Sequence, residues 1–334
     1  MRLFHNVPEK MLFAANALLS AWINFFGKKP LKANEILVVK IDEIGDMVSA
    51  TPVFKLLKER FPHSQITLLC KPVCKTFMQY NPHVNTIICS EKEWQKKFDL
   101  VVELRGTRRT LLKSFRYMPS YRLDRGTVRF KYRSKSGNLS DRETNFLVVK
   151  PLIGDVKLPL PDFFSSPQDK VFVEDFVNNK HLQQFAIIHA TSNQAIKEWS
   201  HQRFAELADW FIEKYGFKVV FIGAQTEFTR TEALIQQMKN SADNFAGTFT
   251  LSQLYEFCKK AAIYVGNDSG PMHIANVAGT PLVGLFGPVP RGVFYPFGNK
   301  AIVIHPQTND RTGESPMSNI SVAEVKSAVQ KLIG

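Results

Sequence analysis

Cysteine is scarce in this chain of 334 residues, and its copies follow neither a disulfide nor a zinc pattern. Cys70, Cys74, Cys89 and Cys258 form no CxxC pair, and no histidine cluster lies beside them. A reducing compartment, the cytoplasm, is therefore the expected location. With 44% hydrophobic and 22% charged residues, the chain also lacks the composition of a disordered, collagen-like or coiled-coil protein, and it is long enough for two globular domains.

Long hydrophobic runs are missing too. No stretch of about 18 apolar residues occurs, so the sequence predicts no helix that spans a membrane. The nearest candidate, residues 11–26, is interrupted by Asn16, Ser20 and Asn24 and is followed by lysines. At about 3.6 residues per turn it forms an amphipathic helix that would pack on the first domain or lie at a membrane interface, and no A-x-A-like site supports a cleaved signal peptide. The apolar stripe of this helix consists of Met11, Leu12, Ala15, Leu18, Leu19, Trp22, Phe25 and Phe26.

Acidic residues are too few to balance the charge of the first half of the chain. Residues 1–166 hold 28 Lys and Arg against 15 Asp and Glu, whereas residues 167–334 hold 15 of each, so the net charge of +13 belongs to the first half. Most of this excess lies between residues 105 and 142, where twelve basic residues accompany only Asp124 and Asp141. Because arginine binds carboxylates and phosphates through paired hydrogen bonds, this basic segment predicts a polyanionic ligand. An anionic lipid surface and a merely solvated basic face are the alternatives.

Nucleic acid is another candidate ligand for the basic segment, since arginines interleaved with Tyr117, Tyr121 and Tyr132 suit phosphates and bases. The remainder of the chain does not support this interpretation, because it carries no helix-turn-helix, zinc, RRM or KH signature. We therefore expect no nucleic-acid partner.

The two halves of the chain begin with the same pattern of strand, loop, helix and strand. In the first half, residues 36–41 and 66–70 read as strands around a helical pattern that follows Gly45. In the second, residues 185–189 and 218–222 are strands around a helix over residues 204–215. This alternation predicts two doubly wound α/β domains with parallel sheets, joined by the proline-rich residues 151–167. Ligands of such domains bind beyond the carboxyl ends of the strands, which predicts a cleft between the two.

Neither half carries a glycine-rich cofactor motif. Residues 41–46 contain one glycine in place of G-x-G-x-x-G, and no Walker A sequence occurs. We therefore expect no cofactor. No DxD-like pair stands in a suitable loop, so the sequence requires no metal ion either.

The most informative stretch is residues 264–273, where an apolar strand ends at Gly266 and a helix begins near Pro271. The small residues between them allow a ligand to approach the backbone, and the helix N-terminus favours an anion. His273 would lie on the first turn beside it, so the motif predicts a diphosphate site. The alternative is that Asp268 or Ser269 only caps the helix and that His273 is a surface residue.

Two further loops of the second half would meet at this site. Lys197 follows the strand 185–189 and can reach a phosphate as a point charge. Glu227 follows the strand 218–222 and can accept hydrogen bonds from ribose hydroxyls. Taken alone, Lys197 is equally consistent with a solvated side chain at the surface. Glu227 is equally consistent with a residue that caps or favours the start of a helix.

Several of these segments together resemble glycosyltransferase family 9, the ADP-heptose:lipopolysaccharide heptosyltransferases and their relatives. The resemblance covers roughly residues 35–333, and the segment before it lies outside. It rests on residues 40–46 with Thr51 and Pro52, 99–106, 189–199, 265–273 and 284–288.

This resemblance implies a GT-B fold with two facing Rossmann-like domains, preceded by a helical segment over residues 1–34. Residues 35–166 would bind the acceptor and residues 167–334 the nucleotide sugar. It implies metal-independent, inverting transfer of a heptose or related sugar from an ADP-sugar to the lipid-linked inner-core saccharide of lipopolysaccharide, at the cytoplasmic face of the inner membrane. The final helix, near residues 322–333, would cross back to the first domain.

The resemblance also implies roles for individual residues. Asp46 matches the catalytic carboxylate. The residues that match the donor-binding set are Lys197, Glu227, Asp268, Ser269, Gly270 and His273.

Inverting transfer requires a base for the acceptor hydroxyl, and Asp46 stands at the start of a helix where it could serve. Asp42 and Glu43 would raise its proton affinity by repulsion while the helix N-terminus would lower it, so the net direction is open. Asp46 could also be only a helix N-terminal carboxylate. For the anionic acceptor, we expect contacts from Arg105, Arg108 and Arg109.

Three alternatives to heptosyl transfer remain at this stage. The chain could be a basic nucleic-acid-binding protein or a non-catalytic scaffold at a membrane. Within the same enzyme class, it could transfer another sugar from UDP or GDP.

Overall fold

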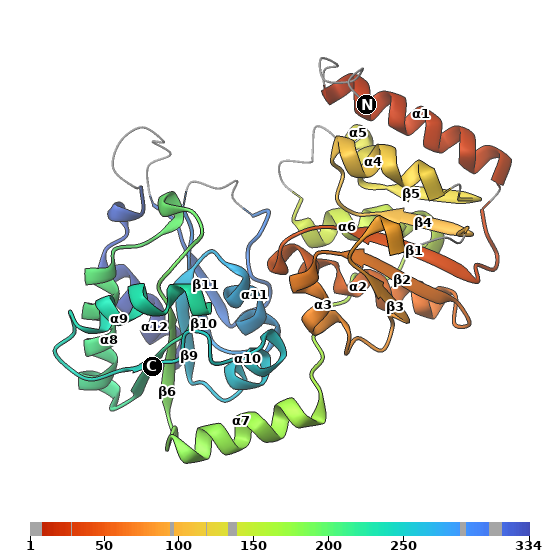
Figure 1. Ribbon diagram of the computed structural model, residues 1–334. Coiled ribbons are helices and arrows are strands. Elements are labelled where there is room, and N and C mark those ends of the chain that lie inside the picture. The colour runs from red at the N-terminus through yellow and green to blue at the C-terminus, as the bar shows by residue number, and fades with distance from the viewer. Residues whose placement is uncertain are drawn as a thin grey trace. The chain divides into compact units, whose positions relative to one another are not determined.

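The computed structural model describes residues 9–27, 29–93, 97–117, 119–132, 139–287, 292–306 and 316–334. The chain divides into two compact units, Met1–Asp162 with Arg291–Phe294 and Phe163–Pro290 with Tyr295–Gly334. Each unit contains one parallel sheet with helices, shown in Figure 1.

The first unit contains a five-stranded sheet in the order β3-β2-β1-β4-β5, in which every neighbouring pair is parallel. Its strands are β1 (Glu35–Lys40), β2 (Gln65–Cys70), β3 (Thr86–Ile88), β4 (Leu100–Glu103) and β5 (Tyr121–Asp124). Its helices are α1 (Glu9–Gly27), α2 (Ile44–Arg60), α3 (Pro72–Met78), α4 (Arg108–Ser114), α5 (Arg125–Lys131) and α6 (Asp141–Ile153).

The second unit contains a six-stranded parallel sheet in the order β11-β10-β9-β6-β7-β8. Its strands are β6 (Phe185–His189), β7 (Lys218–Phe221), β8 (Asp243–Asn244), β9 (Ile263–Asn267), β10 (Leu282–Leu285) and β11 (Ala301–Ile304). Its helices are α7 (Pro167–Asn179), α8 (His201–Tyr215), α9 (Phe228–Ile235), α10 (Leu251–Cys258), α11 (Gly270–Val277) and α12 (Val322–Ile333).

Both strand orders reverse direction beside the first strand of the unit, between β1 and β4 and between β6 and β9. In doubly wound sheets such switch points are where ligands bind, because the connecting helices leave there to opposite faces. The predicted doubly wound α/β fold is confirmed, and the strand 185–189 was predicted with the bounds of β6.

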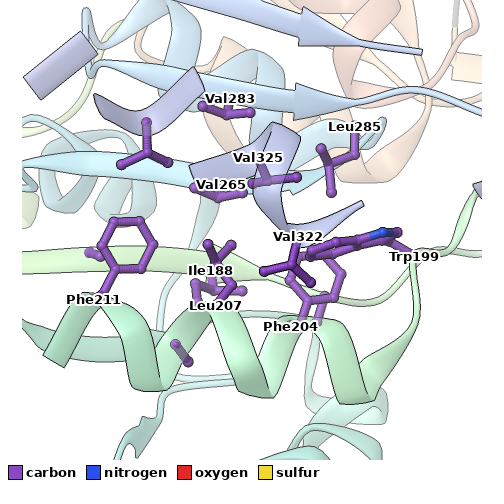
Figure 2. Close-up of a cluster of buried hydrophobic side chains, with 14 of the residues drawn as sticks. Ile188, Trp199, Phe204, Leu207, Phe211, Val265, Val283, Leu285, Val322 and Val325 are labelled. Carbon is purple, nitrogen blue, oxygen red and sulfur yellow. The ribbon is translucent and has the colours of Figure 1, made fainter. Parts of the chain in front are cut away.

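The core of the second unit fills the space between one sheet face and helices α8 and α12. Figure 2 shows Trp199, Phe204 and Phe211 packed against Ile188 of β6, Val265 of β9 and residues of α12. Val322, Val325 and Val329 of α12 are part of this cluster. The expectation that the final helix crosses to the first domain is therefore wrong, because its apolar stripe completes the core of the second unit.

Helix α1 packs on the first unit against α5 and β5. The predicted helix is confirmed, but it faces the unit with its polar residues Asn16 and Ser20, which are buried. Of its apolar stripe, Leu12 is buried, whereas most of the larger side chains are exposed. No helix among the described ranges is long and apolar enough to traverse a bilayer.

Candidate functional site

The predicted anion site of the second unit lies at its switch point, where β6 and β9 end side by side with His189 paired to Gly266. Helix α11 begins at Gly270 with Ser269 as its N-cap, and within the described residues no side chain caps it. The Ser269 hydroxyl instead lies 3.0 Å from Nδ1 of His189. Of the two caps in the alternative, Asp268 or Ser269, the Ser269 side chain does not bond the helix N-terminus, and His273 is half-buried and not at the surface. The first N–H groups of α11 can therefore bind an anion.

Lys197 and Asp268 form an ion pair beside this helix terminus. The Lys197 Nζ lies 2.7 Å from Oδ2 of Asp268, and the Asp268 side chain is buried. Nε2 of His273, on the first turn of α11, lies 4.0 Å from Oδ1 of the same carboxylate. Asp268 thus gathers the two basic side chains that the sequence proposed for a diphosphate.

The Lys197 loop is tied to the sheet by a buried network of hydrogen bonds. The backbone N–H of Trp199 donates to Oδ1 of Asn267 at 3.1 Å, and Nδ2 of Asn267 donates to the carbonyl of Ala190 at 2.9 Å. The Trp199 indole donates to the carbonyl of Ile320 at 2.8 Å. These bonds fix the loop relative to the end of β9, so the position of Lys197 is set by the core.

Glu227 belongs to the same strand edge, where it contacts His189. Oε2 of Glu227 lies 3.6 Å from Nε2 of His189 and accepts the backbone N–H of Ala224 at 2.5 Å. Partial burial would raise the pKa of Glu227, but hydrogen bonds from His189, Thr191 and the Ala224 N–H lower it to about 2. The carboxylate is therefore ionised at neutral pH and can accept hydrogen bonds from a polar ligand.

His189 is a site residue that the sequence did not single out. Its ring bridges Ser269 and Glu227, and its strand pairs directly with β9. A Cβ at Gly266 would lie 2.8 Å from the His189 carbonyl oxygen and 2.9 Å from the Tyr264 hydroxyl oxygen, so only glycine fits there. The signal for His189 was its position as the last residue of a predicted strand.

In the first unit, Asp46 lies on the first turn of α2, directly after the loop that follows β1. Its carboxylate makes no hydrogen bond or ion pair with other residues that the structure describes. Burial raises the pKa of Asp46, although the nearby ammonium of Lys40 opposes this effect. The sequence left the direction of this pKa shift open; it is upward, which makes the Asp46 carboxylate a stronger base than an ordinary aspartate.

The acids next to Asp46 are each paired with a cation. Asp42 is bound by Lys40, at 3.2 Å, and by Arg105. Glu43 is paired with Lys71. Burial, and not repulsion from these two acids, is therefore the main cause of the raised pKa of Asp46.

A buried carboxylate, Asp141 at the start of α6, belongs to a charge cluster that acts on Asp46. Asp141 lies 3.5 Å from Nζ of Lys40 and 2.5 Å from Nη2 of Arg125, and it accepts a hydrogen bond from Ser49 of α2. These bonds to positive groups lower the pKa of Asp141 even though its burial acts in the opposite direction. The sequence did not predict Asp141, Lys40 or Arg125 as site residues, because their meeting depends on how β1, α5 and α6 pack.

Comparisons with known proteins show which family the chain belongs to. A family model described as glycosyltransferase family 9 (heptosyltransferase) matches residues 155–320. Lipooligosaccharide heptosyltransferase 2 of Haemophilus ducreyi is 23% identical over 312 residues, which is 81% of this chain and 88% of the relative. Lipopolysaccharide heptosyltransferase 2 of Salmonella typhimurium is 24% identical over 306 residues, 81% of this chain and 87% of the relative. The chain belongs to glycosyltransferase family 9.

Solved structures have the same fold as this family 9 glycosyltransferase. A family 9 glycosyl transferase of Veillonella parvula superimposes with a TM-score of 0.77 at 23% identity, over 90% of this chain and 97% of the other. The ADP-heptose lipopolysaccharide heptosyltransferase II of Escherichia coli gives a TM-score of 0.70 at 22% identity, over 90% and 98%. The GT-B fold that the sequence predicted is confirmed.

The basic segment of the glycosyltransferase is divided between structural and surface roles. Arg122 and Arg125 are buried and pair with Asp124 and Asp141, so they stabilise the first unit. Of the predicted acceptor contacts, Arg105 is half-exposed and bound by Asp42, whereas Arg108 and Arg109 lie on the first turn of α4. Arg133 and Lys135 lie outside the described residues.

All four cysteines of the glycosyltransferase are free thiols. Within the described ranges, no group of three or more His, Cys, Asp or Glu side chains is arranged to hold a metal ion. The metal independence of the reaction stays a prediction.

Proposed function

We propose that this family 9 glycosyltransferase transfers a heptose from ADP-heptose to the inner-core saccharide of lipopolysaccharide. The observation that carries the proposal is the pair of switch points: one presents Lys197 and His273 at the N-terminus of α11, and the other presents the half-buried Asp46 at the start of α2. Two of its relatives are heptosyltransferases by name. A heptosyltransferase of Escherichia coli with the same fold was solved with ADP-2-deoxy-2-fluoro heptose. It superimposes with a TM-score of 0.64 at 16% identity, over 89% of this chain and 99% of the other.

The second unit would hold the donor. In this proposal the diphosphate binds the backbone N–H groups of Gly270 and Met272 in the first turn of α11, with Lys197 and His273 beside it. As the sugar leaves, negative charge grows on the diphosphate, and these groups stabilise it where it forms. Asp268 would act as a positioning residue, because a carboxylate repels phosphate but orients the ammonium of Lys197. The ionised Glu227 would accept hydrogen bonds from the ribose.

The first unit would supply the base. The Asp46 carboxylate takes the proton of the acceptor hydroxyl while the hydroxyl oxygen forms a bond to the anomeric carbon. The bond between that carbon and the phosphate oxygen breaks, and its electron pair leaves with ADP, so the configuration is inverted. The expected cleft between the domains stays a prediction.

The acceptor would be an anionic saccharide attached to lipid. The exposed Arg109 and the half-buried Arg108 on α4 carry the charge that such an acceptor requires. Because its lipid is held in a bilayer, the enzyme has to reach the cytoplasmic face of the inner membrane, and we propose that it associates there peripherally.

One set of measurements tests this function against its alternatives. Isothermal titration with ADP, UDP and GDP should show clear preference for ADP, and mass spectrometry should detect heptosylated product only with ADP-heptose and a delipidated inner-core acceptor. A preference for UDP or GDP would assign another sugar donor. If neither transfer nor hydrolysis occurs across a donor panel, the enzymatic proposal is wrong, and retention on nucleic acid can then be assayed.

A further inference from the structure

Helix α1 is turned with its polar face inward. Nδ2 of Asn16 donates to Asp124 at 2.6 Å, and the Ser20 hydroxyl donates to the same carboxylate at 2.8 Å. One turn further on, the Asn24 side-chain amide exchanges two hydrogen bonds of 2.7 Å with the backbone of Arg122. These residues recur at every fourth position and therefore share one face of the helix.

The inward contacts fix the rotation of α1 about its axis. Asp124 and Ser20 are buried, and Arg122 pairs with the same carboxylate at 2.6 Å. Rotation of the helix would leave these polar groups without partners inside the protein, which costs more than the exposure of apolar side chains on the surface. The apolar face is therefore held outward by the structure.

The outward face of α1 is large, apolar and free of charge in its middle turns. Leu18 is 73% exposed, Trp22 61% and Phe25 79%. The ring centroids of Trp22 and Phe26 are 5.2 Å apart, so the two rings are in contact. The other exposed large apolar residues of α1 and the segment that follows it are Met11, Leu19, Phe26 and Leu31. An exposed apolar patch of this kind marks an interaction site.

The surroundings of this face are basic. Lys29 and Lys32 are exposed just beyond the end of α1. The helices α4 and α5, which contact α1 as Figure 1 shows, expose Arg109 and Lys131 and add the apolar side chain of Phe130. An apolar helix face with aromatic residues and a basic border matches the boundary between headgroups and acyl chains of an anionic bilayer.

We propose that the outward face of α1 (Met11, Leu18, Leu19, Trp22, Phe25 and Phe26) is the surface by which this enzyme docks on an anionic lipid bilayer. The helix lies in the plane of the interface and inserts by about 5–10 Å. The choice of a bilayer over a second copy of the chain follows from the basic border and rests in part on the lipid-linked acceptor of the proposed function. Docking would hold the first unit, with Asp46, at the membrane where that acceptor resides.

Flotation with lipid vesicles tests the surface directly. The full-length protein should float with vesicles of phosphatidylethanolamine and phosphatidylglycerol, and less with phosphatidylcholine alone. Phe25→Glu combined with Phe26→Glu should weaken binding by about tenfold or more, because two exposed rings are replaced by charges. The matched control is Val171→Glu with Phe172→Glu, an exposed apolar pair on α7, which should float like the wild type.

Fluorescence locates the helix in the bilayer. Lipids brominated high on the acyl chain should quench the fluorescence of Trp22. The contribution of Trp22 is the difference in quenching between the wild type and Trp22→Phe. Equal flotation of the wild type and the Phe25/Phe26 double variant, or no flotation of either, would overturn the proposal. So would a lipid-free dimer that the double variant converts to a monomer, because the face would then belong to a second copy.

Turnover separates this inference from the proposed function. With a delipidated acceptor in solution, the Phe25/Phe26 double variant should transfer heptose at the wild-type rate, which also shows that it is folded. With acceptor embedded in vesicles it should be slower by about tenfold. If the wild type transfers nothing in solution but floats through α1, the proposed function fails while the docking surface stands.

Discussion

The ammonium of Lys197 lies 2.7 Å from Oδ2 of Asp268, although 70 residues separate them in the sequence. The lysine follows β6 and the aspartate follows β9, and these strands are neighbours only because the strand order reverses between them. The pair therefore places a fixed positive charge at the N-terminus of α11.

Removal of the Lys197 charge should weaken donor binding. Lys197→Ala should raise the Kd for ADP by about 10–100-fold, the loss typical of a charge-assisted hydrogen bond. Isothermal titration measures this change. Lys260→Ala, which alters an exposed ion pair of the same unit, is the control and should bind ADP normally. Unchanged affinity and unchanged turnover in Lys197→Ala would show that the lysine does not contact the phosphates.

Loss of the Asp46 carboxylate should abolish transfer but not donor binding. Asp46→Asn preserves the shape of the side chain and removes its capacity to accept a proton, so turnover should fall by about 100–10,000-fold. The Kd for ADP should stay within a few-fold, since the donor is held by the other unit. Asp155→Asn, at a highly exposed carboxylate, should leave both unchanged. Normal turnover in Asp46→Asn would remove this residue from the mechanism.

The raised pKa of Asp46 should be visible in the pH dependence of the rate. A base works in its ionised form, so kcat/KM should fall as the pH drops through a pKa that lies above the ordinary aspartate value. Lys40 lowers this pKa by its charge, and Lys40→Met should therefore move the acid limb to higher pH.

Lys71→Met is the control for this shift, because Lys71 pairs with Glu43 at the surface and its loss should move the limb little. Thermal unfolding of both variants establishes that they are folded. A limb that stays in place in Lys40→Met would show that the Lys40 charge does not act on the base.

An alanine at Gly266 should disturb the donor site more than an alanine at Gly284, which is paired with Gly266 on the neighbouring strand β10. A Cβ at Gly266 meets the backbone carbonyl of His189 at 2.8 Å, but one at Gly284 meets the flexible Sδ of Met272 at 3.0 Å. Gly266→Ala should lower the melting temperature by roughly 2–10 °C and weaken ADP binding. Gly284→Ala should have the smaller effect on both. An equal response would mean that β9 can shift without cost.

The exposed arginine of α4 should matter for the acceptor alone. Arg109→Ala should raise the KM for a delipidated acceptor several-fold, because a charged contact to an anionic saccharide is lost. The Kd for ADP should not change. Arg116→Ala removes another exposed charge of the basic segment and is the control. If both variants respond equally, the basic segment attracts the acceptor only by its overall field.

Local patterns in the sequence determined the fold class and the loops of the donor site. The strands β1, β6 and β9 are short apolar runs whose residues are nearly all buried, so their positions follow from composition. Asp268 directly follows such a strand and Lys197 lies in the loop after another, and the carboxyl ends of parallel strands share one edge. Their meeting could therefore be predicted without any knowledge of distances.

Only the tertiary structure decided which polar groups are buried and paired. The cluster of Lys40, Arg125 and Asp141 joins β1 to residues far along the chain, and only the packing of the first unit shows that burial of Asp46 raises its pKa although Lys40 and Arg125 oppose this. For the same reason, the periodicity of α1 predicted two faces but not which one turns inward. That choice depends on Asp124, which belongs to a distant strand and offers Asn16 and Ser20 the hydrogen bonds that hold the helix.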